Sequence, residues 1–210
     1  MDDIVEARHV LHAVAEHLLA GPQWRHTGEI ALTVTDGGFG TTTHPAPGVH
    51  ALEVRGRHVL AEPGGIQVPI AGSVREMATA IGIEPGAPME LYREHATLSV
   101  DDALMPDDQA LALVLEALIA GAQALQALSS AHDAILWPEH FDVGITIDEV
   151  NYGVSPGDSN HDLPYAYVGP WTPRTGPFWN EPFGASRPVG TLHDIAEILA
   201  FFEEGRGRAS

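Results

Sequence analysis

The sequence predicts an α+β fold, in which small antiparallel sheets pack against a long central helix and the C-terminal third is rich in Pro, Gly and aromatic residues. Strand patterns occur in neighbouring pairs without a helix between them, which favours hairpins over a doubly wound parallel sheet. The most apolar helical pattern, at 106–128, is expected to form the centre of the core. The 210 residues are interpreted as one compact domain, 1–210, with sub-regions 1–130 and 131–210.

The first element is predicted to be a helix. Apolar residues recur at helical spacing over 4–18, and Gly21-Pro22 is expected to end the helix. Three polar residues share the opposite stripe, as on an amphipathic surface helix: His9, His12 and Glu16.

A small antiparallel sheet is expected next. Asp36-Gly37-Gly38 supplies the turn of a hairpin, because Gly tolerates the backbone conformations that such turns need. Alternating apolar residues mark the strands, which are predicted at 30–35, 39–43, 50–55 and 58–61.

Two helices and one strand are predicted between the sheet and the C-terminal third. Ser73-Val74-Arg75-Glu76 is a capping box, which predicts a short helix to Ile81. A strand is expected at 89–94. The helix at 106–128 has Pro106 at its first position and two acidic residues beside its positive end.

The stretch from 136 to 188 is predicted to be ordered, although it is rich in Pro and Gly. It holds three of the four Trp and three of the four Tyr, and large rings are costly to leave exposed in a flexible linker. Alternation within it predicts a strand at 143–150 and an antiparallel return at 163–168. Thr191 is expected to cap a last helix over 192–202.

The composition excludes several classes of partner and site. The chain has 29 acidic and 10 basic residues, for a formal charge of −19, and every basic residue is an arginine. Nucleic acid and anionic membranes are therefore disfavoured as partners. The absence of cysteine excludes disulfides and thiolate zinc sites. We expect a cytoplasmic location, because the N-terminal residues lack the pattern of a secretory signal and no run of about 18 apolar residues is found.

Titratable and aromatic side chains are densest in the segment 136–183. His140 and Asp142 are two positions apart, so on a strand they would share one face, where the carboxylate can orient the imidazole or both can bind one cation. Asp158 and His161 follow a Ser-Pro-Gly turn. We therefore expect catalytic roles in proton transfer for His140, Asp142 and Asp158, and a divalent metal ion held by these three residues together with His161. Five aromatic residues are the expected ligand-binding walls: Trp137, Tyr152, Tyr165, Trp171 and Trp179.

Structural roles compete with these assignments. Asp158 can cap its own turn, His140 can donate to a buried carbonyl, and Trp137 and Tyr167 can belong to the core. Two separate pairs are also favoured over one four-residue site, because the ends of an eight-residue strand lie about 25 Å apart.

Three segments of the C-terminal third carry a distinctive pattern. A Leu-Trp-Pro-x-His-Phe-Asp run starts at Leu136, a Ser-Pro-Gly-Asp turn ends at Asp158, and a Pro-Tyr-x-Tyr-Val strand starts at Pro164. This pattern resembles a family of bacterial, mainly actinobacterial, proteins classed as a domain of unknown function. The resemblance implies no activity or cofactor. It implies only that the following residues fall at the family's patterned positions: His140, Asp142, Asp158 and Tyr165.

Two functional hypotheses follow. The first is a small-molecule-binding protein or enzyme with its pocket in 136–183, aided by a divalent metal ion in one version. The alternative is a noncatalytic interaction or structural protein, such as a homodimer with an aromatic interface. The chain has no G-x-S-x-G elbow, H-E-x-x-H pair or P-loop, so the sequence leaves open whether the protein is an enzyme.

Overall fold

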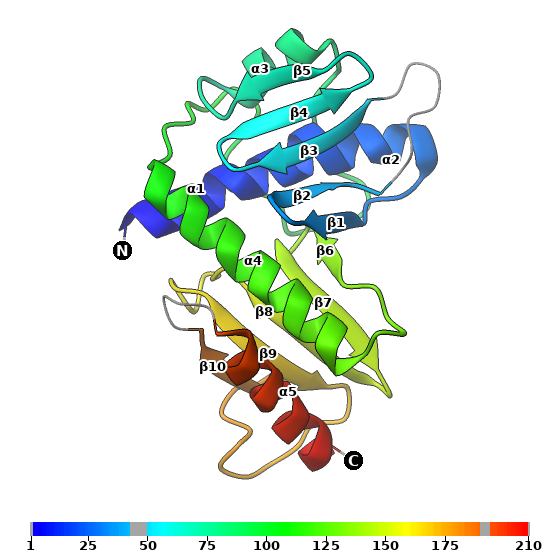
Figure 1. Ribbon diagram of the computed structural model, residues 1–210, viewed down its shortest axis with the longest axis vertical. Coiled ribbons are helices and arrows are strands. Elements are labelled where there is room, and N and C mark those ends of the chain that lie inside the picture. Colours follow the sequence, from blue (N-terminus) through cyan, green and yellow to red (C-terminus); the bar gives the residue numbers. More distant parts are fainter. Residues whose placement is uncertain (1, 43–49, 190–193, 210) are drawn as a thin grey trace.

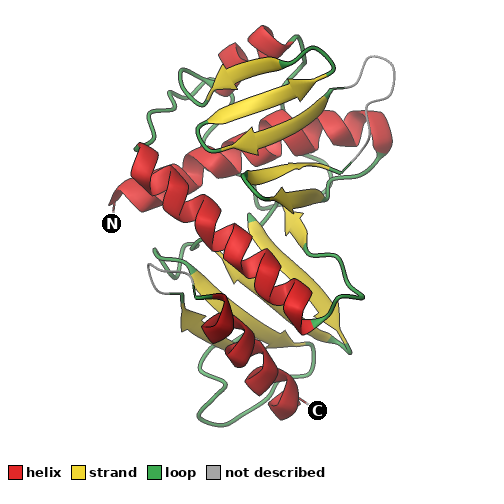
Figure 2. Cartoon of the chain, viewed as in Figure 1, coloured by secondary structure: helices red, strands yellow, loops and turns green. Residues whose placement is uncertain are grey.

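The protein has an α+β fold in which a ten-stranded antiparallel sheet packs against helices (Figures 1 and 2), as predicted. The structure is a computed structural model that describes residues 2–42, 50–189 and 194–209. The N-terminal half contains α1 (Asp2–Ala13), the π-helix η1 (Val14–Ala20), α2 (Gly21–Thr27), β1 (Leu32–Thr35), β2 (Gly38–Thr41), β3 (Ala51–Arg55), β4 (His58–Glu62), β5 (Ile66–Pro69) and α3 (Val74–Ile81). The C-terminal half contains α4 (Asp108–Leu128), β6 (Ile135–Trp137), β7 (Asp142–Ile147), β8 (Val150–Ser155), β9 (Tyr165–Pro170), β10 (Ala185–Pro188) and α5 (Ile195–Ala209).

The two halves repeat one arrangement: a helical segment, a meander of five strands and a closing helix. The strand order is β10-β9-β8-β7-β6-β1-β2-β3-β4-β5, so the meanders meet through their first strands. Leu32 of β1 pairs with Leu136 of β6 in antiparallel register. An antiparallel pair of equivalent strands relates the halves by an approximate two-fold axis, a relation that the sequence does not reveal.

The sheet twists strongly between its two ends. Neighbouring strands rotate by about 20–25°, so ten strands turn the sheet by roughly half a revolution. In Figure 1, β3 and β4 therefore lie in front of α1, whereas β7 and β8 lie behind α4. The view shows the outer face of the sheet in the N-terminal half and the inner, helix-covered face in the C-terminal half.

Helix α4 is the centre of the core, as its apolar pattern predicts. It packs against β7, β8, α1 and α5, and Gly121 allows the closest approach, since a Cβ atom there would lie 2.7 Å from Val154. Among the described helices, α4 alone is long and apolar enough to span a membrane by length and composition, with a mean hydropathy of 1.7. In the fold it is a core helix, and its buried side chains include Leu111, Val114, Leu115, Leu118 and Leu125.

The N-terminal helical segment is longer than predicted and buries its polar stripe. Gly21-Pro22 does not end it: the chain continues through α2, and Gly28 ends the segment with a left-handed φ of 74°. Pro22 is tolerated because it follows the π-helical turn and falls in the first turn of α2, where an amide is not needed. Glu16 is fully buried, so the interpretation of a solvent-facing stripe was wrong.

Several predicted boundaries differ from the structure. The segment 89–94 forms turns and no strand. Asp107 is the N-cap of α4, accepting from the Ala110 amide, so Pro106 precedes the helix. Helix α5 runs to Ala209, and Asp194 accepts from the Ala196 amide near its start, while Thr191 lies outside the described residues.

The largest error concerns the second meander, where the strand predicted at 143–150 is two strands. The chain reverses at Asp148 and Glu149, which both have positive φ (50° and 63°), and β8 then runs beside β7. Turns of this kind usually contain Gly or Asn, so the sequence does not signal this one. As a result β8 lies between β7 and β9, and 143–150 does not pair with 163–168. The short strands β5, β6 and β10 were not predicted.

Candidate functional site

A groove of about 710 Å³ lies on the outer face of the sheet in the C-terminal half. Side chains alternate along the strands, so Val143 and Ile145 of β7 are buried on the inner face while Asp142 and Gly144 point the other way. The groove is lined by outer-face residues of β6, β7, β8 and β9, by the turn between β6 and β7, and by residues 131–133.

Tyr167 of β9 reaches across two strands to the floor of this groove. The register aligns Gly144 of β7, Gly153 of β8 and Tyr167 in one row. A Cβ atom at Gly153 would overlap the Tyr167 ring, and one at Gly144 would lie 3.0 Å from its hydroxyl oxygen. Because both residues are glycines and have no side chain, the Tyr167 ring fits over them. The Tyr167 hydroxyl donates a hydrogen bond to Asp142 Oδ2.

The Asp142 carboxylate is the polar centre of the groove. Its Oδ1 atom has almost no exposed surface and accepts no hydrogen bond from the described residues. Burial raises the pKa of Asp142 above its ordinary value, and the nearby Glu139 carboxylate adds to the increase, whereas the Tyr167 hydroxyl, His140 and the backbone amide of Asp142 itself oppose it. Burial and Asp142 together raise the pKa of Tyr167, so the phenol remains the hydrogen-bond donor of the pair.

The turn between β6 and β7 is anchored in the core. Phe141 has a positive φ of 51°, uncommon for a residue with a side chain, and its amide donates to the Trp137 carbonyl at 2.8 Å. Its ring is buried against Phe39 and stacks on His12, whose Nε2 lies 2.7 Å from the Pro138 carbonyl. Burial lowers the pKa of His12 to about 4, so this contact is made by a neutral imidazole.

Glu139 lies in the same turn and supplies a second carboxylate to the groove. Its Oε2 atom is buried and, like Asp142 Oδ1, accepts no hydrogen bond from the part of the chain that the structure describes. A buried polar oxygen without a partner costs about 1–3 kcal/mol. Two such oxygens in one groove are therefore the strongest sign that it receives hydrogen-bond donors from outside the chain.

His140 also lines the groove, but not as the sequence predicts. The positive φ of Phe141 breaks the expected strand, so His140 lies in the turn and does not share a strand face with Asp142. Its side chain is 60% exposed, and its Nδ1 atom lies 3.7 Å from a carboxylate oxygen of Glu94. His140 and Asp142 therefore face the same groove without a direct hydrogen bond.

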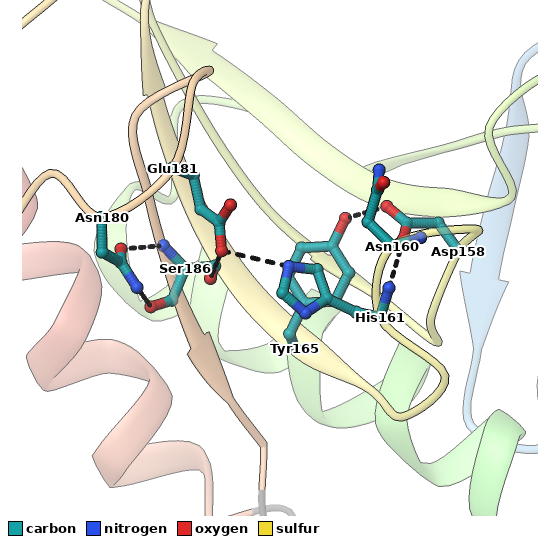
Figure 3. A network of polar contacts seen from close by, with 7 residues as sticks. All are labelled: Asp158, Asn160, His161, Tyr165, Asn180, Glu181 and Ser186. Carbon is teal, nitrogen blue, oxygen red and sulfur yellow. Dashed lines mark hydrogen bonds and ion pairs between the residues drawn. The ribbon is translucent and has the colours of Figure 1, made fainter.

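Asp158 belongs to a different structure, a hydrogen-bonded network beside the groove (Figure 3). Its Oδ1 atom accepts from the amides of Asn160 and His161 at 2.7 and 2.8 Å, and its Oδ2 atom accepts from the Tyr165 hydroxyl at 2.7 Å. Partial burial alone would raise the pKa of Asp158, but these hydrogen bonds lower it below its ordinary value. Asp158 therefore caps its own turn, which is the structural role that the sequence offered as the alternative to a catalytic one.

His161 completes this network. Its Nε2 atom lies 3.1 Å from Glu181 Oε1, which also accepts a 2.7 Å hydrogen bond from the Ser186 hydroxyl. Its ring packs on that of Tyr165, with centroids 4.7 Å apart. Figure 3 shows His161 between Tyr165 and Glu181, where it joins the loop after β8 to the segment before β10.

The structure does not form the four-residue metal site. His140 and Asp142 line the groove, whereas Asp158 and His161 are in the network. Over the described residues, no three His, Asp or Glu side chains are placed to hold one metal ion. The prediction of one shared metal site was wrong because composition alone cannot tell a residue that caps a turn from one that faces a ligand.

One of the five expected aromatic walls, Trp137, lines the groove. Tyr152 points to the inner face and packs edge-on against Phe202. Tyr165 is in the network, Trp179 packs edge-on against Phe178, and Trp171 is 63% exposed. Sequence reasoning missed Tyr167 and Glu139. The spacing of Tyr165 and Tyr167, two apart on one strand, was the available signal that both rings share the outer face.

A second buried polar cluster lies on the π-helix and is largely paired within the chain, although His17 Nδ1 has no hydrogen-bond partner among the described residues. Glu16 accepts hydrogen bonds from His95 Nδ1 at 2.5 Å and from the Ala96 amide at 2.7 Å, and His17 Nε2 lies 3.0 Å from the Leu98 carbonyl. The Gly86 amide donates to the His17 carbonyl at 2.8 Å. These contacts hold the long segment between α3 and α4 against the N-terminal helix.

The groove therefore combines three carboxylates, two histidines, a phenol and a tryptophan on an open sheet face. A raised carboxyl pKa beside other titratable groups is typical of binding and catalytic sites, although ion-pair networks can produce it too. The resemblance to the actinobacterial family stays a prediction. Comparison of the chain with protein-family models, with curated proteins and with solved structures found no match.

Proposed function

We propose that the protein binds a small organic molecule in the outer-face groove over β6 and β7. The observation that carries the proposal is the Asp142 carboxylate, which belongs to a residue that lines the groove and whose buried Oδ1 atom has no hydrogen-bond partner among the described residues. Groups of this kind are rare in folded proteins, and a ligand that donates to the oxygen would remove the cost. The volume of about 710 Å³ is also in the range of small-molecule pockets.

The groove also supports an enzymatic version of this proposal. Burial raises the pKa of the Asp142 carboxyl above its ordinary value, which makes it a stronger proton acceptor than an exposed carboxylate, and general acid–base catalysis uses carboxyl groups shifted in this direction. His140, exposed on the same groove, is the second group that could exchange a proton with a bound molecule. Asp158 is no longer part of the proposed catalytic set, because its carboxylate is engaged in the network.

The experiment is a fragment screen by ligand-observed NMR, followed by titration of each hit against three variants. Asp142→Asn and Trp137→Ala change the groove, while Asp158→Asn is the matched control, because it alters a partly buried, hydrogen-bonded carboxylate of the same half outside the groove. We expect the first two variants to weaken binding at least tenfold and the control to bind normally. Hits that bind equally well to all three variants, or a screen without hits, would refute the proposal.

A second candidate function is self-association through exposed aromatic residues of the C-terminal half. Trp171 is 63% exposed and Phe183 is 42% exposed, and large exposed rings are enriched in protein interfaces. Light scattering after gel filtration tests this candidate: a dimer that Trp171→Ser converts to a monomer supports it, and a monomeric parent protein rejects it. We keep a cytoplasmic location as part of both proposals.

A further inference from the structure

We infer that the ligand of the groove is a small organic cation, an amine, amidine or guanidine whose N–H groups donate to Asp142 and Glu139 while its apolar part lies against Trp137. This inference rests on the proposed function and adds the chemical class of the ligand.

The two unpartnered oxygens define which groups the ligand must present. Asp142 Oδ1 and Glu139 Oε2 are both buried, and both residues line the groove. Ionised carboxylate oxygens are acceptors only. A ligand that satisfies both must therefore carry at least two N–H or O–H donors, and a cation also offsets the repulsion between the two carboxylates.

The charges around the groove favour a cation over an anion. Its acidic lining residues are Asp133, Glu139 and Asp142, and its lining contains no arginine. The chain has no lysine and a formal charge of −19, so the field around the protein attracts cations and repels anions. An aromatic ring also attracts cations, and Trp is the most effective ring for this.

A metal ion fits these groups less well than an organic cation. A divalent ion needs several ligands around one point, and the described residues contain no group of three His, Asp or Glu side chains placed to hold one. An organic cation has no such requirement, because its N–H groups reach separate acceptors.

The N-terminal half offers an internal comparison. On the outer face of β3, the Glu53 carboxylate accepts from the Thr35 hydroxyl at 2.9 Å and from the Arg55 guanidinium at 2.7 Å. In the C-terminal half, Asp142 has the hydroxyl partner, Tyr167, but no guanidinium among the described residues. The same sheet face thus pairs a carboxylate with a hydroxyl and an internal cation in one half, and with a hydroxyl alone in the other.

The test uses three probes of nearly the same shape: benzamidine, which is a cation, benzamide, which is neutral, and benzoate, which is an anion. Each is titrated calorimetrically into the full chain and into Asp142→Asn, Glu139→Gln and the control Asp158→Asn. We expect benzamidine to bind at least tenfold more tightly than benzamide, and benzoate not to bind. Asp142→Asn and Glu139→Gln should each weaken benzamidine binding at least tenfold, and the control should not.

The pH dependence gives a second readout. Burial raises the pKa of Asp142 above its ordinary value, so a cation that binds its ionised form should displace a proton and bind more tightly as the pH rises, and Asp142→Asn should remove the part of this pH dependence that Asp142 contributes. The measured heat should also change with the ionisation enthalpy of the buffer. If Asp142→Asn leaves both effects unchanged, they do not arise from ionisation of Asp142, and the cation does not bind this carboxylate.

Three outcomes overturn the cation class: benzamide or benzoate binding as tightly as benzamidine, benzamidine binding that both variants leave unchanged, or no benzamidine binding. Different outcomes would reject the proposed function itself. If benzamide or benzoate binds and Asp142→Asn abolishes that binding, the groove is a ligand site and only the class is wrong. If the fragment screen also gives no hit that depends on the groove, both proposals are rejected. Melting temperatures of the variants show that each is folded.

Discussion

Replacing Tyr167 with Phe tests whether the groove is built as described. The change removes one hydroxyl and leaves the ring in the space provided by Gly144 and Gly153. The Asp142 carboxylate then loses its hydrogen bond from the Tyr167 hydroxyl. Since hydrogen bonds to charged groups contribute about 1.5–3 kcal/mol, we expect the free energy of unfolding to fall by that amount.

The expected change in melting temperature follows from the size of the chain. For 150–250 residues, 1 kcal/mol corresponds to about 2–4 °C, so Tyr167→Phe should lower the melting temperature by about 3–12 °C. Urea denaturation at pH 7 gives the free energy directly.

A double-mutant cycle with Asp142→Asn isolates the interaction between the two side chains. In the Asp142→Asn background the acceptor is neutral, so loss of the Tyr167 hydroxyl should cost only about 0.5–1.5 kcal/mol. We expect a coupling energy of about 1 kcal/mol or more. If Tyr167→Phe costs the same in both backgrounds, the hydroxyl does not act through the Asp142 charge and the described groove floor is wrong.

The pH dependence of the same variants has a defined sign. The pKa of Asp142 is raised in the folded state from an ordinary value of 3.8. The stability that this group contributes is therefore fully present below pH 3.8 and is lost as the pH rises through the higher folded-state value. Asp142→Asn has no such loss, so the variant should gain stability relative to the parent between pH 4 and pH 8. A constant difference over this range would show that the pKa of Asp142 is not raised.

The remaining predictions concern the network, the sheet and the surface charge. Asp158→Ala should lower the free energy of unfolding by about 1–3 kcal/mol without affecting binding in the groove, because it leaves the Tyr165 hydroxyl and two amides unpaired. The lowered pKa of Asp158 gives the opposite pH dependence to that of Asp142: its stabilisation is present above pH 3.8 and is lost in acid, which urea titrations at pH 3 and pH 6 can measure. Gly153→Ala should destabilise the protein by about 1–3 kcal/mol, since the added methyl group overlaps Tyr167, and unchanged denaturation curves would contradict that packing. At physiological salt, electrophoretic and vesicle-flotation assays should detect no binding to duplex DNA or anionic vesicles, and micromolar binding would contradict the argument from net charge.

Periodic patterns allowed the sequence to predict the inner, packed face of the fold. The pattern at 106–128 predicts the core helix α4, and alternation predicts β1 to β4. Capping chemistry was equally informative, because the Ser73 hydroxyl accepts from the Glu76 amide at the start of α3, as the sequence predicts. Periodicity and capping depend on residues close together in the sequence, so they can be recognised without knowledge of the tertiary structure.

The errors arise where the chain reverses without the usual turn residues. Asp148 and Glu149 adopt positive φ without a glycine, so the β7–β8 hairpin was missed and the pairing of the whole second meander was wrong. Phe141 does the same between β6 and β7. Each of these residues is held by tertiary or sheet contacts that a single sequence does not display, as with the burial of Phe141 against Phe39.

The sequence singled out some of the residues that line the candidate groove and missed others. His140, Asp142 and Trp137 are among the lining residues. Tyr167 enters it only because β8 is inserted between β7 and β9 and carries Gly153 at the crossing point. The pairing error therefore hid the hydroxyl that now defines the Asp142 environment.

The approximate two-fold arrangement allows the outer sheet faces of the two halves to be compared over the described residues. In the N-terminal half, the outer face of β3 presents Arg55 beside Glu53, and the guanidinium supplies the charge that this carboxylate needs. In the C-terminal half, the crossing position on β8 is Gly153, and the space above it holds a neutral phenol. A phenol can donate one hydrogen bond but cannot neutralise a carboxylate. The same sheet architecture thus gives an internally neutralised surface in one half and an acidic groove with unsatisfied acceptors in the other, and that difference makes the C-terminal half the one to test for a ligand.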